Sequence, residues 1–168
     1  MARIRIITGG VNSGKSARFL RLWREAAQAG QTNQPVGLYS EKIQNAAGVV
    51  TGYDLVFLSG GEGEKHPFIF PRETIPPENA GDYFFQGRYA FLKESFQMAE
   101  RHTLRALEHA GNCSVWLDEV GNLELKGLGF DALLRVLFKS EREVTFTVRS
   151  SLLKKIAAKY GITAYELL

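Results

Sequence analysis

The chain has 168 residues, which suits one domain with a substantial core and leaves little room for a second. A hydrophobic content of 45% and a charged content of 23% exclude disorder as the main state. The net charge of +3 is mild, and it does not indicate nucleic-acid binding.

The cysteine content and the hydropathy exclude further classes of protein. Cys113 is the only cysteine, so the sequence excludes an internal disulfide and a cysteine-based zinc site, and we expect Cys113 to be buried. No apolar run approaches the ~18 residues of a membrane span, and no secretory leader pattern opens the chain. These features predict a cytoplasmic protein without a membrane partner, and they do not indicate an oligomeric state.

The first predicted elements are a strand, a glycine-rich turn and a helix. Residues 4–8 form a nearly continuous apolar run, typical of a parallel strand covered on both faces. Residues 9–16 then match the phosphate-binding pattern GxxxxGK[ST]. A helical pattern follows from Lys15, with Gly30 expected to cap its end. A chance glycine-serine turn beside a solvated lysine is the alternative, but the strand before and the helix after are the context that the motif requires.

Each position of this loop has a chemical role. Glycines let successive N–H groups converge on phosphate oxygens, and the helix that follows points its N-terminal dipole at the same place. Lys15 is expected to bridge the β- and γ-phosphates, and the Ser16 hydroxyl to bind Mg²⁺. The residues predicted to bind the nucleotide are Gly9, Gly10, Val11, Asn12, Ser13, Gly14, Lys15, Ser16 and Ala17.

The middle of the chain predicts further strands around a loop. Residues 36–40 indicate a second strand, and residues 49–58 and 66–70 indicate antiparallel strands joined by a glycine-rich turn at 59–63. Residues 71–82 contain three prolines and are expected to form a mobile loop that, with residues up to Gly87, orders over the nucleotide. Short strands are predicted at 83–85 and 89–91, followed by a helix over 95–110.

A second motif lies at residues 115–119, where a buried strand ends in two carboxylates. In phosphate-loop enzymes an acidic residue at the end of a central strand holds Mg²⁺, and Asp118 fits that role. Glu119 fits the separate role of orienting or deprotonating the attacking water. The remaining pattern predicts a helix over 130–138, a strand over 144–148, a helix capped by Ser150 and Ser151 that ends at Gly161, and an edge strand within 162–167.

Three stretches together resemble one family, the small P-loop nucleoside-triphosphatases first known from thermophiles and also called cancer-related nucleoside-triphosphatases. They are residues 9–16, residues 36–41 with the hairpin 48–56, and residues 117–125, whose Leu-Asp-Glu-Val-Gly-Asn-Leu-Glu-Leu is similar to the family's Asp-Glu-Ile-Gly-Lys-Met-Glu-Leu. Residues 95–107 also fit the helix that precedes the third stretch.

The resemblance implies an α/β fold, a RecA-like three-layer sandwich with a mainly parallel sheet and an antiparallel hairpin insertion, over residues 1–168. It also implies slow, Mg²⁺-dependent hydrolysis of several NTPs to NDP and phosphate, with Asp118 on Mg²⁺ and Glu119 on the water. Two basic positions depart from the family: Asn122 replaces its lysine, and the basic residue after the second strand is Lys42 and not an arginine. Arg149 is a candidate for the missing charge, and an ordinary solvated strand-end arginine is the alternative.

Two other functions compete with hydrolysis. The loop is also similar to those of cobinamide and thymidine kinases, so a small-molecule kinase is the first alternative. Thymidine kinases carry a cysteine-rich zinc lobe that a chain with Cys113 alone cannot build. A regulatory protein that binds an NTP and uses its hydrolysis to time an interaction is the second alternative. The preferred base and the physiological substrate do not follow from the sequence.

Overall fold

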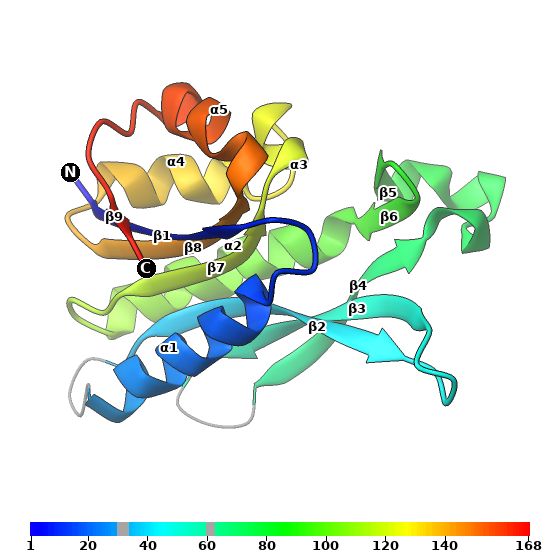
Figure 1. Ribbon diagram of the computed structural model, residues 1–168, viewed down its shortest axis with the longest axis horizontal. Helices are drawn as coiled ribbons and strands as arrows, with labels where there is room; N and C mark the ends of the chain where they lie inside the picture. The colour runs from blue at the N-terminus through cyan, green and yellow to red at the C-terminus, as the bar shows by residue number, and fades with distance from the viewer. Residues whose placement is uncertain (30–33, 60–62) are drawn as a thin grey trace.

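The computed structural model describes residues 1–29, 34–59 and 63–168, and one mixed sheet runs through them (Figure 1). The nine strands of this described part follow the order β5-β6-β4-β3-β2-β7-β8-β1-β9. Four of the eight pairings in it are parallel and four are antiparallel. The protein therefore has an α/β fold whose sheet is divided into a parallel half and an antiparallel half.

The parallel half carries the motif residues. Its strands are β2 (Val36–Gln44), β7 (Val115–Val120), β8 (Glu143–Arg149), β1 (Arg3–Gly9) and β9 (Glu166–Leu167). Because β1, β7 and β8 run in the same direction, their carboxyl ends meet at one edge of the sheet. The loop after Gly9, the Asp118-Glu119 pair and Arg149 are thereby brought to the same edge.

The antiparallel half is larger than the single hairpin that the sequence predicts. It consists of β3 (Val50–Leu58), β4 (Glu64–Pro71), β6 (Tyr89–Leu92) and β5 (Tyr83–Gln86), which extend the same sheet beyond β2. The expectation of a mainly parallel sheet is wrong in this respect, because β5 and β6 pair with each other and β6 pairs with β4. In Figure 1 this hairpin lies at the end of the molecule away from both termini.

The segment that the sequence predicts to be a mobile loop contains regular structure. Residues 71–82 contain two short 3₁₀ helices, η1 (Arg72–Thr74) and η2 (Pro77–Asp82). The Lys93 ammonium donates a hydrogen bond to the Gly81 carbonyl at 2.6 Å, and the Arg72 N–H donates to the Arg88 carbonyl at 2.8 Å. The prolines set 3₁₀ geometry here, because a fixed φ near −65° suits short helical turns.

Helices cover both faces of the sheet (Figure 1). Helix α1 (Lys15–Ala29) packs on one face, while α2 (Lys93–His109), α4 (Asp131–Lys139) and α5 (Ser150–Tyr160) contribute to the core of the other. Strand alternation separates the two cores: Ile7 and Trp116 lie in the α1 core, whereas Ile6 and Leu117 lie in the opposite one. The short helix α3 (Asn122–Leu125) follows β7 directly and contacts α5.

Several local predictions can be compared with the structure. Cys113 is buried, as expected, and Gly161 ends α5 in a left-handed conformation with φ 65°. The predicted cap at Ser150 and Ser151 is wrong, because Arg149 is the residue that precedes the helix and, among the described residues, no side chain caps it. The predicted roles of Gly30 and of turn residues 60–62 lie outside the described residues. None of the described helices is long and apolar enough to cross a bilayer.

Candidate active site

The loop between β1 and α1 is stabilised by its own polar groups. The Ser13 hydroxyl donates to the Gly10 carbonyl at 2.8 Å, and the Lys15 ammonium donates to the same carbonyl at 2.7 Å. Asn12 and Gly14 have positive φ values of 53° and 80°, which turn the chain tightly before the helix. The result is a compact loop with a lysine held across it.

The first turn of α1 leaves donors facing this loop. The Arg18 N–H bonds the Gly14 carbonyl at 2.9 Å and begins the helical hydrogen-bond series. The amides of Lys15, Ser16 and Ala17 come before that bond, and the first N–H groups of a helix have no partner within it. Together with the positive end of the helix dipole, they suit a phosphate group.

Asp118 is a buried carboxylate directly behind the loop. Its Oδ1 accepts hydrogen bonds from the Ser16 hydroxyl at 3.2 Å and from the Thr147 hydroxyl at 2.7 Å. Its Oδ2 accepts a longer bond from the Ser40 N–H at 3.4 Å. Burial, followed by the nearby charge of Glu119, raises the pKa of Asp118 to about 7. A cation beside this carboxylate would favour its ionised form.

The Ser16 and Asp118 oxygens suit a magnesium ion. Both are hard oxygen donors, they lie within hydrogen-bond distance of each other, and the carboxylate is 1% exposed. Mg²⁺ prefers one or two protein oxygens together with phosphate oxygens and waters. This donor set therefore fits the metal that the sequence predicts.

Glu119 has a backbone conformation that a regular strand does not contain. Its φ is 65°, and the pairing of β7 with β8 shifts by one residue between Leu117 and Val120. Both of these flanking side chains belong to the same core, although they are three residues apart. The Glu119 N–H bonds the Thr147 hydroxyl at 2.8 Å, which holds the bulge in place. The bulge leaves the Glu119 side chain exposed on the pocket instead of packed on the sheet.

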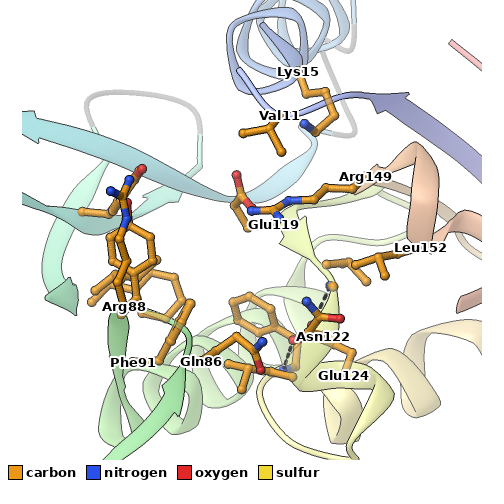
Figure 2. A pocket seen from close by; sticks show the side chains of 18 of the residues that line it. Val11, Lys15, Gln86, Arg88, Phe91, Glu119, Asn122, Glu124, Arg149 and Leu152 are labelled. Atoms are coloured by element: carbon orange, nitrogen blue, oxygen red, sulfur yellow. Dashed lines mark hydrogen bonds between the residues drawn. The ribbon is translucent and has the colours of Figure 1, made fainter. Parts of the chain in front are cut away.

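A pocket of about 550 Å³ lies at this edge, and its two sides come from the two halves of the sheet. The parallel half contributes Val11, Lys15, Glu119 and Arg149, and Figure 2 shows Arg149 extending toward Glu119 below Lys15. Arg149 is the register partner of Gly9, so it stands beside the start of the loop. The sequence-based suggestion that Arg149 supplies charge at this edge stays a prediction.

The antiparallel half contributes pocket residues that the sequence does not predict. Tyr53, Arg88, Tyr89 and Phe91 come from β3, β6 and the turn before β6. The rings of Tyr53 and Tyr89 meet edge to face with centroids 6.0 Å apart, and the Arg88 guanidinium lies 5.1 Å from the Tyr89 ring centre. The aromatic content of 89–91 was visible in the sequence, but its orientation depends on long-range strand pairing.

The floor of the pocket is fixed by Glu124. This buried carboxylate accepts the Gly121 N–H at 2.7 Å and the Phe130 N–H at 2.9 Å. Burial raises its pKa, while those two amides act in the opposite direction. Asn122, the first residue of α3, also lines the pocket. Glu124 thus ties the end of β7 to the segment that leads into α4.

The structure brings most predicted residues together in two neighbouring places. Val11, Asn12, Lys15 and Glu119 line the pocket, whereas Ser16 and Asp118 meet behind the loop. The remaining predicted loop residues are Gly9, Gly10, Ser13, Gly14 and Ala17, which lie along the same turn and the first turn of α1. The sequence does not predict the contacts of Thr147 and Ser40 with Asp118. The one indication for Thr147 is that it is a polar residue in an alternating strand, on the face that packs against the core.

Comparison with known proteins shows the family to which the chain belongs. A family model described as NTPase matches residues 5–168. The chain belongs to this NTPase family. Among curated proteins, it is 28% identical over 166 residues to the nucleoside-triphosphatase THEP1 of Thermotoga sp. (strain RQ2), covering 96% of this chain and 84% of the relative. THEP1 of Thermotoga maritima is 27% identical, with the same coverage.

Two solved structures share the fold of this NTPase-family chain. The solution structure of a human cancer-related nucleoside triphosphatase matches with a TM-score of 0.72 and 20% identity, over 99% of this chain and 88% of that one. The crystal structure of THEP1 from Aquifex aeolicus matches with a TM-score of 0.68 and 18% identity, over 98% and 88%. At these identities the likeness concerns the fold, so the roles of individual residues depend on the geometry above.

Proposed function

We propose that this protein is a Mg²⁺-dependent nucleoside-triphosphatase that converts NTP to NDP and phosphate, and that residues 1–168 act as one RecA-like domain. The observation that carries the proposal is the contact between the Ser16 hydroxyl and Asp118 at 3.2 Å, which joins residues 102 positions apart. It brings the phosphate loop to the carboxylate strand end, as phosphoryl-transfer sites require. The family match and the THEP1 relatives support the same activity.

In this proposal the loop holds the triphosphate. Backbone N–H groups from Gly10 to Ser16 and the first turn of α1 donate to the β-phosphate oxygens. The Lys15 ammonium exchanges its bond to the Gly10 carbonyl for the β- and γ-phosphate oxygens. Ser16 and Asp118 would hold Mg²⁺, which would neutralise part of the negative charge of the phosphates.

Hydrolysis then requires a base and a positive charge at the γ-phosphate. Glu119 accepts a proton from the attacking water, the water oxygen bonds to the γ-phosphorus, and NDP leaves with the electrons of the broken phosphoanhydride bond. Arg149, beside Gly9 in the sheet, is proposed to stabilise the charge on the γ-phosphate oxygens. The strained backbone of Glu119 supports a functional role, because such conformations cluster at active sites.

Isothermal calorimetry with a panel of Mg·NTPs tests the binding part of this proposal. Lys15→Ala should lose tight NTP binding, because it removes the loop cation and leaves the strand and the helix intact. Lys155→Ala, an exposed change on α5 away from the pocket, is the matched control and should bind like the unmodified protein. Unchanged NTP affinity in a folded Lys15→Ala protein would contradict the phosphate-loop assignment.

A further inference from the structure

The pocket extends well beyond the phosphate loop. The cavity measures about 550 Å³, and it extends from Lys15 and Glu119, where the γ-phosphate and the attacking water are proposed to lie, to Arg88, Tyr89 and Phe91. That volume falls within the range of small-molecule sites, about 300–1,000 Å³. Figure 2 shows Arg88 and Phe91 on the side of the pocket across from Arg149.

The direction of phosphoryl transfer determines which molecule can bind in the part of the pocket beyond Glu119. This inference rests on the proposed function above. In-line displacement places the attacking oxygen opposite the oxygen that leaves with NDP. Glu119 marks the attacking side, and the nucleoside of the bound NTP is attached through the leaving side. The region beyond Glu119, with Arg88 and Tyr89, therefore lies where a second molecule would approach the γ-phosphate, not where the same NTP places its base.

The walls of this region favour a planar ring. Tyr53 and Tyr89 meet edge to face at 6.0 Å, and the Arg88 guanidinium lies 5.1 Å from the Tyr89 ring centre. Aromatic faces and a guanidinium plane are the groups on which nucleobases stack. Burial, followed by the neighbouring Tyr89, raises the pKa of Tyr53 to about 12, so its phenol stays neutral at physiological pH.

Charge on the same walls favours an anion. Arg88 and Lys42 line the pocket, and within the described residues neither forms an ion pair with a carboxylate. Both are exposed, so they are available to a ligand. An arginine and a lysine placed beside an aromatic wall match a phosphorylated planar compound better than a neutral one.

We propose that this region binds a nucleoside monophosphate and that the enzyme can transfer the γ-phosphoryl group of NTP to one of its ribose hydroxyls. The hydroxyl oxygen bonds to the γ-phosphorus, its proton passes to Glu119, and the bond from the γ-phosphorus to the bridging oxygen breaks so that NDP leaves with that electron pair. A carboxylate at the attacking position suits a neutral hydroxyl that must lose a proton, whereas it repels an ionised phosphate oxygen. The product is therefore a nucleoside bisphosphate, not a diphosphate.

The test combines γ-labelled Mg·NTP with a panel of nucleoside 5′-monophosphates and identifies the labelled products by chromatography and mass spectrometry. A labelled nucleoside bisphosphate is the expected product. Nucleosides lack the anion and ribose 5-phosphate lacks the ring, so each should accept phosphate at least roughly 10-fold less efficiently, the loss expected for one charge-assisted or stacking contact. Transfer to the phosphate oxygen, no transfer to any monophosphate, or equal transfer to all three acceptor types would overturn the proposal.

A variant pair separates the acceptor site from the triphosphate site. Arg88→Gln should reduce kcat/KM for the monophosphate roughly 10-fold and change that for the nucleoside much less, because only the monophosphate carries the anion. Lys155→Gln is the matched control with an exposed cation outside the pocket, and it should behave like the unmodified protein. An equal effect of Arg88→Gln on both acceptors would contradict the assignment of Arg88 to the acceptor site.

Phosphate release that depends on Lys15 but occurs without any transfer to an acceptor would remove this inference. It would leave the proposed NTPase function intact.

Discussion

Gly9 shows how closely the phosphate loop is packed at the level of single atoms. A Cβ at this position would lie 2.4 Å from the Ser13 hydroxyl oxygen, whereas a Cβ at Gly10 would meet no atom of the described residues within 4 Å. Ser13 cannot move aside without giving up its bond to the Gly10 carbonyl. The first glycine of the motif is therefore required by the loop itself, before any nucleotide binds.

Thermal denaturation of two alanine variants tests this difference. Gly9→Ala should lower the free energy of unfolding by about 1–3 kcal/mol, the usual cost of forcing extra volume into a packed site. Gly10→Ala should change it by less than about 0.5 kcal/mol, because the position is open. Equal melting temperatures for the two variants would show that Ser13 does not fix the loop.

Asp118 predicts a specific pH dependence of stability in the nucleotide-free protein. Its pKa is raised to about 7, above the value near 3.9 in an unfolded chain, so the folded state binds the proton more tightly. This contribution to stability is complete below pH 4 and is lost as the pH rises through 7. Asp118→Asn lacks the buried ionisable group and should not show that loss.

Denaturant unfolding of both proteins between pH 5 and pH 8 tests the point. The stability of Asp118→Asn relative to the unmodified protein should increase with pH, by at most about 1.4 kcal/mol per pH unit, the limit for one proton. Added Mg·NTP should restore the stability of the unmodified protein at pH 8, because bound ligand stabilises the folded state. A difference in stability between the two proteins that does not change with pH would contradict the raised pKa of Asp118.

At the level of elements, sequence patterns predict neither the β7 bulge nor the full length of β2. The apolar run of 115–117 predicts β7 and its two terminal carboxylates, but not the extra residue that leaves Glu119 with a φ of 65°. That bulge depends on pairing with β8 and on Thr147, which lies 28 residues further along the chain. Similarly, β2 continues to Gln44 because β3 pairs with its polar end, which no apolar pattern marks.

Hydrogen exchange tests the regular structure of the antiparallel half. The amides that pair β5 with β6 should be protected in the nucleotide-free protein, because residues 83–86 form a ladder with 89–92. Gly87, at the exposed turn between these strands, provides the internal control and should exchange quickly. Exchange across 83–86 as fast as at Gly87 would restore the expectation of a mobile loop that orders only over a nucleotide.

At the scale of the whole molecule, the pocket is formed by the two halves of one sheet. The loop and the strand-end carboxylates could be predicted because each motif is local and the parallel strands bring their carboxyl ends to one edge. The opposite wall, with Tyr53, Arg88 and Tyr89, could not be predicted, because its position depends on β3, β4 and β6 pairing across the sheet. Long-range pairing has no signature in one sequence, so this wall required the three-dimensional structure.

The measurement that tests the central claim most directly is single-turnover hydrolysis by Glu119→Gln, with NTP affinity measured on the same preparation. If Glu119 activates water at a triphosphate held by the loop, the variant should keep its Mg·NTP affinity and its melting temperature and lose roughly 10²–10⁴-fold in rate. A glutamine preserves the size of the side chain, and the Glu119 N–H bond to Thr147 is made by the backbone. Hydrolysis at the unmodified rate would contradict the assignment of Glu119, and a loss of stability with an unchanged rate per folded molecule would make its role structural.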